Sequence, residues 1–493
     1  MNSIMLLLPV FLPIAWGALS KFIKFRTRRS REIFLMIPIC ATTALVWALI
    51  LNRPDGSFTL FKFTQNLAIT LRLDDFGAFF AAIVATLWPV ATVYAFEYIS
   101  PEKRTDTFLA FYTMTYGITL GVSFASSLLS MYFFYELLTL VTVPLVMFTM
   151  TEDAKYAARK YLYFSLGGTA FAFIGLVFII VYGSSDAFLA GGVLDASGIG
   201  NARLLQIVYL LTFCGFGVKA AIFPVHSWLP EAAVAPTPVT ALLHAVAVVK
   251  SGVFAIARVT YFSFGAAFLR GTWAQYAAIA IALVTILYGS SVAVRERHFK
   301  RRLAWSTVAN LSYILFGVLL LSPAGLASGM MHMLFHAFMK ITLFYCAGAV
   351  LYKTEREYLS ELDGLGRRMP VTFTCYTVSA LALTGIPPFS GFYSKFALGT
   401  AGVMDGGVWG MVGAGVLLVS ALLTAIYALY PAVRAFLPQK GSLPPPGDIH
   451  DPNWYMLAPI ILTCAATVLF GMFSGGIYDS LYQVASGILG GGL

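Results

Sequence analysis

Apolar residues fill the chain in continuous runs of about 18 to 25 residues, and short polar segments separate these runs from one end to the other. Strands of a membrane barrel would instead alternate apolar and polar residues over about ten positions. Only helices and closed barrels satisfy their backbone hydrogen bonds inside a bilayer, so continuous runs indicate helices. The pattern therefore predicts an all-α membrane protein.

We expect about 14 transmembrane helices, whose bounds follow from hydropathy and helix-breaking residues. The predicted spans are residues 3–20, 33–51, 76–96, 107–125, 127–149, 161–182, 206–224, 237–258, 274–293, 303–320, 327–351, 370–398, 408–433 and 454–475. The first span lacks a basic segment before it and a small-residue cleavage site after it, which favours a retained helix over a cleaved targeting peptide.

The composition agrees with this class, since 59% of the 493 residues are hydrophobic and 11% are charged. The formal net charge of +10 comes from loops that alternate in their content of Lys and Arg. Loops on one side carry 22 of these residues, and loops on the other side carry six. The positive-inside rule then predicts that the 22 face the cytoplasm of a cell membrane and that both termini lie outside. The basic excess reflects topology, and nucleic acid is not an expected partner.

The five cysteines each fall inside a predicted span, with no C-x-x-C spacing and no two close together. This distribution argues against disulfides, iron–sulfur clusters and covalent haem. The chain also lacks a G-x-x-x-x-G-K-[ST] loop and a G-x-G-x-x-G motif that opens a helix after a strand. We therefore expect no cofactor, no redox active site within this chain and no nucleotide-driven pumping.

Five charged side chains fall inside predicted spans. They are Glu136, Lys219, Lys250, Lys340 and Lys395. A charge at the bilayer centre costs about 2.5 to 3.5 kcal/mol, so together they oppose insertion by roughly 10 to 18 kcal/mol unless they are paired, neutralised or hydrated. Such a set is a hypothesis for a functional site.

Two spans are interrupted beside one of these lysines. In span seven Lys219 lies five residues before Pro224, and in span twelve Pro387 and Pro388 precede Lys395. A proline inside a helix frees a backbone carbonyl, which is tolerated at membrane depth only where protein or water satisfies it. If spans four to eight and spans nine to thirteen are two units, each break falls in the fourth member. Since five is odd, the second unit enters from the opposite face, as in the inverted repeats of transporters.

The expected repeat divides the chain into four parts. These are an N-terminal three-helix segment at residues 1–106, a first five-helix repeat at 107–258, a second five-helix repeat at 274–435 and a C-terminal helix at 454–493. The repeat rests on the placement of breaks and charges, because the two halves do not align residue for residue by eye.

His332, His336 and Lys340 lie at four-residue steps in HMLFHAFMK, so they point to roughly one side of a helix, about 6 Å apart along its axis. Such a stripe can serve as interhelical glue, with histidines bonded to neighbouring helices and a lysine that snorkels. Two histidines four apart can also bind zinc, but no carboxylate or cysteine accompanies them and the lysine would repel a cation. We favour a proton chain and expect no metal.

The remaining candidates have plainer alternatives. Glu136 either forms a structural ion pair or contacts Lys219 in a way that opens and closes, which changes when the lysine holds its proton. In span eight, His244 and Lys250 lie six residues apart, about 240° around a continuous helix, so they cannot both face one partner squarely. Lys250 has the better case, and His244 fits a bonded core histidine equally well. Lys300 begins span ten and is most simply an inside-positive anchor.

At these residues the sequence resembles the antiporter-like subunits shared by respiratory complex I, the Mrp sodium/proton antiporters and the membrane-bound group 4 hydrogenases. The motifs that carry the resemblance are YELLTL, VKAAIFPVHSWLPEAAVAPTPVTALLH, FKRRLAWSTVANLSYILFG, HMLFHAFMK, DGLGRRMP and GIPPFSGFYSK. In length the chain is closest to the Mrp D-type and to the shorter complex I or hydrogenase subunits. The resemblance implies fourteen helices, two inverted five-helix repeats, two half-channels and a hydrophilic axis along the membrane plane.

The resemblance also implies a role for each candidate residue. Glu136 resembles the modulating carboxylate, Lys219 its partner on the broken helix, Lys250 the bridging residue of span eight, His332, His336 and Lys340 the central relay, and Lys395 the terminal lysine. Lys300 matches a family lysine at the start of span ten, which strengthens its functional case. The presence of both His244 and Lys250 combines features of different members and leaves the subfamily open.

We therefore expect a subunit that moves protons, with exchange for sodium as an option, within a multisubunit complex of the complex I, Mrp or hydrogenase type. Its expected partners are other membrane subunits, the lipid bilayer and the transported ions. One rival is a stand-alone secondary transporter for an organic solute, and another is a structural membrane scaffold. Four lysines spread over different spans favour a path over one compact pocket.

Overall fold

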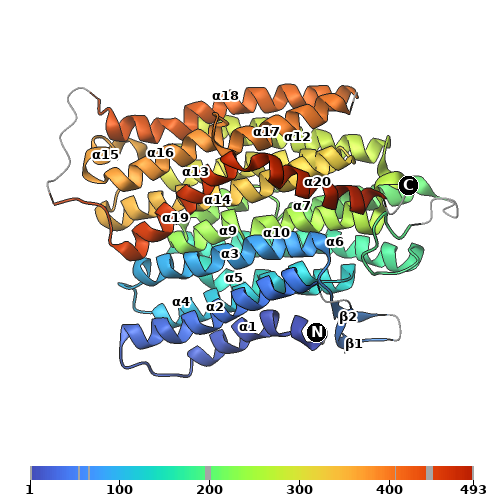
Figure 1. Cartoon of the computed structure of the whole chain (residues 1–493), viewed down its shortest axis with the longest axis horizontal. Coiled ribbons are helices and arrows are strands. Elements are labelled where there is room, and N and C mark those ends of the chain that lie inside the picture. The colour runs from blue at the N-terminus through green and yellow to red at the C-terminus, as the bar shows by residue number, and fades with distance from the viewer. Residues whose placement is uncertain are drawn as a thin grey trace.

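The computed structural model of the protein describes residues 3–53, 56–64, 67–194, 201–405, 407–439 and 448–490. Most of its helices run side by side along the long axis of the molecule, and a small hairpin caps one end (Figure 1). Ten helical segments of the described ranges are long and apolar enough to cross a membrane. The predicted all-α membrane architecture is confirmed.

The elements follow the predicted spans closely. The first part holds η1 (Ser3–Leu6), α1 (Leu8–Ser20), α2 (Arg28–Asn52), β1 (Phe58–Lys62), β2 (Ala68–Leu71), α3 (Asp75–Tyr98), α4 (Thr105–Phe124), α5 (Leu128–Val146), α6 (Glu152–Tyr182), α7 (Ala202–Gly217), α8 (Trp228–Glu231), η2 (Ala232–Val234), α9 (Thr237–Ala245), α10 (Val248–Arg258) and the π-helix η3 (Val259–Phe264). The second part holds α11 (Ala266–Leu269), α12 (Trp273–Arg295), α13 (Phe299–Leu319), α14 (Pro323–Thr354), η4 (Leu359–Glu361), α15 (Leu365–Arg368), α16 (Pro370–Thr384), α17 (Ser390–Met404), α18 (Val408–Phe436), α19 (Trp454–Met472) and α20 (Ser474–Gly490). Strands β1 and β2 pair antiparallel, with Phe58 opposite Leu71.

Both expected interruptions are present. Span seven is helical only as far as Gly217, and a non-helical segment at residues 218–227 follows it. Span twelve divides into α16 and α17 around residues 385–389. The number of fourteen spans stays a prediction, because Leu8–Ser20, Ala202–Gly217 and Pro370–Thr384 are shorter than the ten spanning segments.

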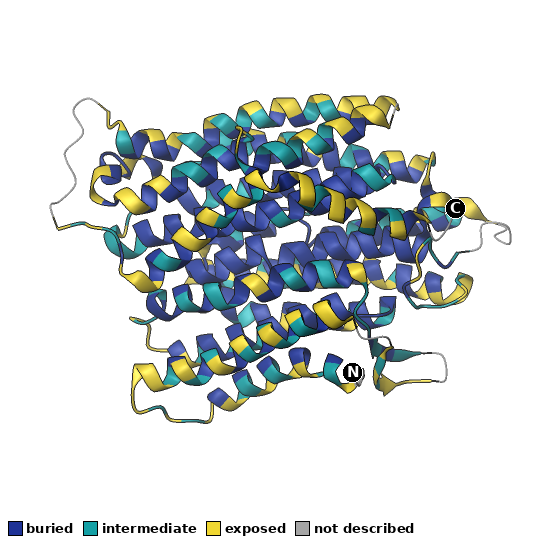
Figure 2. Ribbon diagram, viewed as in Figure 1, coloured by how far each residue is buried: buried dark blue, intermediate teal, exposed yellow. Residues whose placement is uncertain are grey.

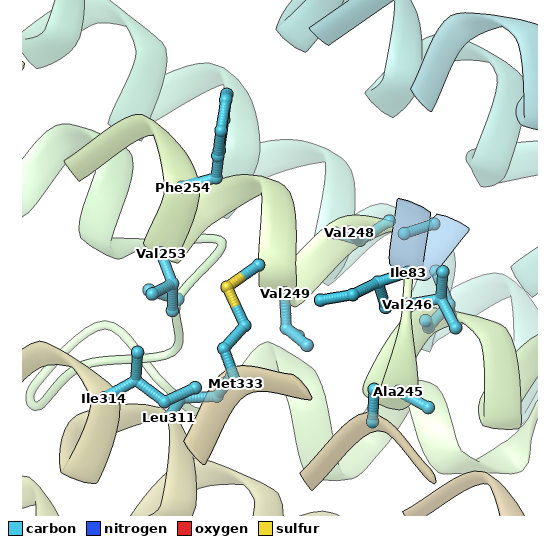
Figure 3. Close-up of a cluster of buried hydrophobic side chains, with 14 of the residues drawn as sticks. Ile83, Ala245, Val246, Val248, Val249, Val253, Phe254, Leu311, Ile314 and Met333 are labelled. Carbon is cyan, nitrogen blue, oxygen red and sulfur yellow. The ribbon is translucent and has the colours of Figure 1, made fainter. Parts of the chain in front are cut away.

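Span eight contains a third break that the sequence did not predict. Its helix stops at Ala245 and resumes at Val248, although neither Pro nor Gly lies between them. Apolar side chains pack around this break: Val246, Val248 and Val249 beside it, Ile83 from α3, and Met333 from α14 (Figure 3). Tertiary packing therefore accommodates a break that no local sequence signal marks.

The helices at the centre of the bundle are enclosed by protein. In the most apolar window of each segment, 100% of Thr237–Phe264, 94% of α13 and 89% of α14 is buried, against 33% of α18. Figure 2 shows the same contrast between a dark core and the outer helices. Polar side chains on the central helices therefore meet protein and not lipid, which removes much of the cost of placing them at membrane depth.

The predicted single C-terminal helix is two helices, α19 and α20, which meet near Phe473. The second one packs along α14 and has no long apolar run, so hydropathy alone missed it. Spatial packing also brings together two cysteines that are far apart in sequence, since Cys464 Sγ lies 3.9 Å from the carbonyl oxygen of Cys375. All five cysteines are free thiols.

The start of α13 is stabilised by an uncharged histidine. His298 is the N-cap, and its Nδ1 accepts a hydrogen bond from the backbone N–H of Arg301 at 3.4 Å. Burial lowers the pKa of His298, Lys300 and Arg301 lower it further, and Glu357 and Glu296 oppose them. This cap therefore contributes fully above the ordinary histidine pKa of about 6.5, and its contribution is lost as the pH falls below that value.

We expect acidification from pH 7.5 to 5.0 to lower the thermal unfolding midpoint of the detergent-solubilised protein by about 1–2 °C through this cap alone, because an N-cap contributes about 1 kcal/mol. The His298→Asn variant keeps a capping side chain that does not titrate, so its unfolding midpoint should depend less on pH. Identical pH profiles for the two proteins would contradict this role of His298.

Candidate functional site

The site begins where α5 meets the non-helical segment after α7. Lys219 is fully buried, its ammonium lies 3.4 Å from the centroid of the Tyr135 ring, and it donates a hydrogen bond to the carbonyl oxygen of Tyr135. Glu136 follows directly on α5, and its Oε1 is buried without a hydrogen-bond partner among the described residues. The carboxylate acts on Lys219 electrostatically, but the ion pairs of the described residues do not include these two side chains. Within the described residues, the Glu136 and Lys219 side chains thus interact electrostatically without forming an ion pair, and we call this arrangement open.

The broken segment is held in place by side chains that satisfy its backbone. Trp228 Nε1 donates to the carbonyl oxygen of Val218 at 2.7 Å, and the backbone N–H of Phe223 donates to Thr285 Oγ1 at 2.9 Å. A Cβ atom on Gly252 would lie 2.5 Å from the backbone nitrogen of Ala220. Helix α10 therefore packs directly against the segment that carries Lys219, and only glycine permits this approach.

Lys250 connects the two predicted repeats. Its Nζ lies 2.6 Å from Nδ1 of His336 on α14 and 3.3 Å from the carbonyl oxygen of His244. That carbonyl can accept because the helix is interrupted between α9 and α10. Because of this break, His244 and Lys250 do not lie on one continuous helix, so the predicted angle of 240° between them is wrong. The break places the backbone of His244 beside the Lys250 ammonium.

The His244 imidazole has no partner of its own among the described residues. Both ring nitrogens are buried without a hydrogen bond, and the ring lies 4.8 Å from that of Phe344, centroid to centroid. The positive charges of Lys340, Lys250 and Lys300 all act on it. The His244 imidazole therefore lies among three lysines without a hydrogen bond to any of their ammonium groups.

From His336 the polar series continues along α14 to α17. The rings of His336 and His332 lie 5.8 Å apart, centroid to centroid. His332 Nδ1 lies 2.9 Å from Ser394 Oγ, and its Nε2 lies 3.2 Å from Asn310 Oδ1. The next residue, Lys395, is half-buried and donates to the carbonyl oxygens of Leu383 at 2.6 Å and Thr384 at 3.2 Å. The carbonyl oxygens that accept from Lys395 thus belong to the end of α16, beside the break in span twelve.

Lys340 shares the stripe but has a separate partner. Its Nζ donates to the carbonyl oxygen of Leu303 at 2.9 Å and to Ser306 Oγ, both on α13. The three side chains of the stripe thus reach different neighbours, since His336 contacts Lys250 and His332 contacts Asn310. Within the described residues no group of His, Cys, Asp and Glu side chains could hold a metal ion.

Lys300 is buried, unlike a solvated loop lysine, and donates to the carbonyl oxygen of Ala235 at 2.9 Å. It lines a polar cavity of about 430 Å³ at the end of the bundle where α13 begins. The acidic residues of this cavity are Glu102, Asp153, Glu231 and Glu357. Lys300 therefore lines an acidic cavity, and its charge also acts on the buried His244.

Sequence reasoning missed several members of this arrangement. They are Tyr135, Ser306, Asn310, Tyr313 and Ser394. Ser306 and Asn310 lie four residues apart inside an apolar span, so helical spacing would have found them. Tyr135 offers no such signal, because tyrosine is common in these spans and its carbonyl is the acceptor.

The chain is similar in sequence to known proteins. The family described as NADH:quinone oxidoreductase/Mrp antiporter, TM matches residues 125–424. NADH-quinone oxidoreductase subunit N from Desulforudis audaxviator is 31% identical over 435 residues, which cover 85% of this chain and 84% of that relative. Na(+)/H(+) antiporter subunit A1 from Staphylococcus haemolyticus is 26% identical over 98% of this chain, but the match spans only 62% of that longer relative.

A similar fold occurs in a solved structure. A chain in the Mrp complex from Dietzia sp. DQ12-45-1b has a TM-score of 0.85 at 22% identity, with 99% of this chain and 97% of that chain covered. The family match extends over more than half of the chain and contains most of the polar series described above. The stand-alone solute transporter is not favoured by these relatives. The chain belongs to the NADH:quinone oxidoreductase/Mrp antiporter transmembrane family, as an antiporter-like multi-pass membrane subunit.

Proposed function

We propose that this subunit moves protons sideways through the membrane along Glu136, Lys219, Lys250, His336, His332 and Lys395, with Lys340, His244 and Lys300 on a side branch. The observation that carries the proposal is the 2.6 Å contact between Lys250 Nζ and His336 Nδ1. It joins a lysine of the first predicted repeat to a histidine of the second. A structural scaffold would have no need for two titratable groups in direct contact at this depth.

The Glu136 and Lys219 pair is the proposed driver. When the pair closes, the carboxylate stabilises the protonated lysine, and when it opens, that stabilisation is lost and Lys219 releases its proton. The open arrangement described above corresponds to the releasing state. A potential of 100 mV acts on each charge with about 2.3 kcal/mol, which a modest change in pair distance can match.

The hydrogen bonds along the series support one tautomer for each histidine. The Lys250 ammonium donates to His336 Nδ1, so the proton of the neutral His336 is on Nε2. Asn310 Nδ2 donates to the carbonyl oxygen of Ser306 at 2.7 Å, so Asn310 Oδ1 accepts from His332 Nε2. His332 Nδ1 is then an acceptor for the Ser394 hydroxyl at 2.9 Å, in competition with the carbonyl oxygen of Gly391 at 3.3 Å. Each histidine thus has one protonated ring nitrogen and one unprotonated ring nitrogen that can accept a proton, as a relay requires.

The assembly and orientation are part of the proposal. We propose that the chain functions beside other membrane subunits of a complex of the complex I, Mrp or hydrogenase type, with both termini outside the cell. The relatives named above are subunits of an oxidoreductase and of an antiporter, and the 22 to 6 distribution of Lys and Arg supports the orientation. As a second function of the same residues, we propose the exchange of protons for sodium ions.

The Lys250→Met variant tests the central contact. It removes the donor to His336 but keeps a long apolar stem, so we expect proton movement by the assembled complex to fall about a hundredfold or more, the lower end of the usual contribution of one acid–base group. The assay is dye-detected acidification of inverted vesicles, with subunit assembly checked on native gels. Lys155→Met, at an exposed lysine, is the matched control. Undiminished proton movement by an assembled Lys250→Met complex would refute the relay.

A further inference from the structure

A chamber of about 560 Å³ lies away from the polar series and is lined by residues just before α12 and at the end of α20. Figure 1 shows the end of α20 beside the C-terminus, at one end of the bundle. The volume of the chamber is within the range of small-molecule sites, about 300–1,000 Å³. The polar side chains of its lining are Tyr261, Arg270, Ser322, Asp405 and Tyr482. Because the spanning helix α12 begins here, where α17 and α20 also end, the chamber lies at the depth of lipid headgroups.

An apolar groove continues from this chamber into the membrane-spanning part of the bundle. The groove has a volume of about 280 Å³ and lies between α17 and α20, over α14. Ala324, Ala401 and Met404 line both hollows, so the two are continuous. Phe396 and Met404 are largely exposed along it. The whole site is thus a polar chamber that opens into a narrow apolar channel.

The chamber contains two opposite charges that the described protein leaves available. Arg270 donates through Nη2 to the carbonyl oxygen of Leu321 at 2.5 Å, while its side chain remains exposed and its other nitrogens have no hydrogen bond among the described residues. Asp405 at the end of α17 is exposed, feels the charge of Arg270, and forms no ion pair within the described ranges. A ligand with one anionic and one cationic group would satisfy both.

We propose that the chamber and the groove together bind one phospholipid with a phosphoethanolamine headgroup. The phosphate is bound by Arg270, whose planar guanidinium matches phosphate oxygens, and the primary ammonium is bound by Asp405. One acyl chain lies in the groove against Phe396 and Met404.

The position gives the bound lipid a structural consequence. Two residues that flank Lys395 in sequence, Tyr393 and Phe396, line the groove. Lys395 itself is half-buried and is the last member of the polar series. An acyl chain there covers the lipid-facing side of α17 with hydrocarbon. It thereby excludes water from that side of the helix that carries the terminal lysine.

The test uses the assembled complex, purified in detergent, stripped of lipid and incubated with palmitoyl-oleoyl phosphatidylethanolamine or phosphatidylglycerol. Retained lipid is counted by native mass spectrometry of the subunit released in the gas phase. We expect Arg270→Ala to retain about tenfold less phosphatidylethanolamine, as the loss of one charge-assisted contact implies. Arg203→Ala, at another exposed arginine on the same predicted side, should retain it as the parent does. Asp405→Asn should lose the preference for phosphatidylethanolamine over phosphatidylglycerol.

Three results would overturn the proposal. Equal lipid retention by the parent complex and Arg270→Ala would exclude a headgroup contact at this arginine. Displacement of the lipid by millimolar inorganic phosphate would indicate an anion site without an acyl chain. Attachment of a photo-crosslinker at residue 396 to a partner subunit, and not to lipid, would assign the groove to a protein interface.

Discussion

Replacement of Lys219 by alanine is expected to reduce proton movement by the assembled complex to background, the largest functional loss of any single change. Lys219 lies in the non-helical segment of span seven, donates to the carbonyl oxygen of Tyr135 and is acted on by the charge of Glu136. Without it, the carboxylate has no protonated lysine to stabilise, and the proposed pair no longer drives the rest of the series. Dye-detected acidification of inverted vesicles measures the loss, and native gels establish that the complex still assembles.

Two further variants separate chemistry from packing. Lys219→Met retains the apolar stem over the Tyr135 ring but removes the charge, so it should fail as completely as alanine. Glu136→Gln keeps the shape of the carboxylate and should also stop proton movement, because an amide cannot modulate the lysine by charge. Full activity in either variant would leave the Glu136 and Lys219 pair without a role. Lys250→Met tests the contact with His336 instead of the Glu136 and Lys219 pair. A loss of proton movement in only one set of variants would therefore show which of the two contacts proton movement requires.

Replacement of Arg258 by methionine is expected to cause the largest loss of stability. Arg258 is the last residue of predicted span eight, and the structure buries it completely. Its two terminal nitrogens each lie 2.5 Å from a carboxylate oxygen of Asp74, and four phenylalanine rings lie 4.6 to 5.3 Å from its guanidinium carbon. Removal of one partner leaves the other charge uncompensated, which costs about 3–5 kcal/mol for a buried pair.

A neighbouring ion pair provides the control. Arg53 and Asp75 lie 2.8 Å apart, but both side chains are mostly exposed, so Arg53→Met should change stability by less than about 1 kcal/mol. The measurement is the thermal unfolding midpoint of the detergent-solubilised protein. The double variant Arg258→Met with Asp74→Leu should recover part of the loss, because neither charge remains unpaired. Equal effects of Arg258→Met and Arg53→Met would contradict this account.

The same pair has a defined pH dependence. Burial raises the pKa of the Asp74 carboxyl, but the charge and hydrogen bonds of Arg258 outweigh burial and hold the pKa below its usual value. The stabilisation is therefore complete above the ordinary aspartate pKa of about 3.9 and is lost as the pH falls below it. At neutral pH the pair acts as a permanent clamp between α3 and the end of α10.

An equivalent clamp occurs in the second predicted repeat. Arg434, near the end of α18, contacts Asp363 through Nε at 2.5 Å and through Nη2 at 2.8 Å. Span eight and span thirteen, the fifth members of the two units, thus each end in an arginine bound by two nitrogens to an aspartate. This recurrence supports the inverted repeat, which stays a prediction together with the domain limits drawn from it.

The sequence by itself determined the class of the protein and the identity of its unusual residues. Continuous apolar runs predicted helices, and the cost of charge in a bilayer singled out Glu136 and the four lysines within these runs. Prolines predicted the breaks in spans seven and twelve. These features are local, because hydropathy and helix-breaking residues act within a single turn or a single span.

Only the tertiary structure decided which of these groups meet. The break in span eight, the contact between Lys250 and His336, and the burial of Arg258 and Lys300 depend on neighbours far away in sequence. Glycine at position 252 allows one backbone to approach another, and Asn310 and Ser394 orient His332 from two other helices. Helical spacing sets which side chains share a face, but the packing of separate helices determines what that face touches.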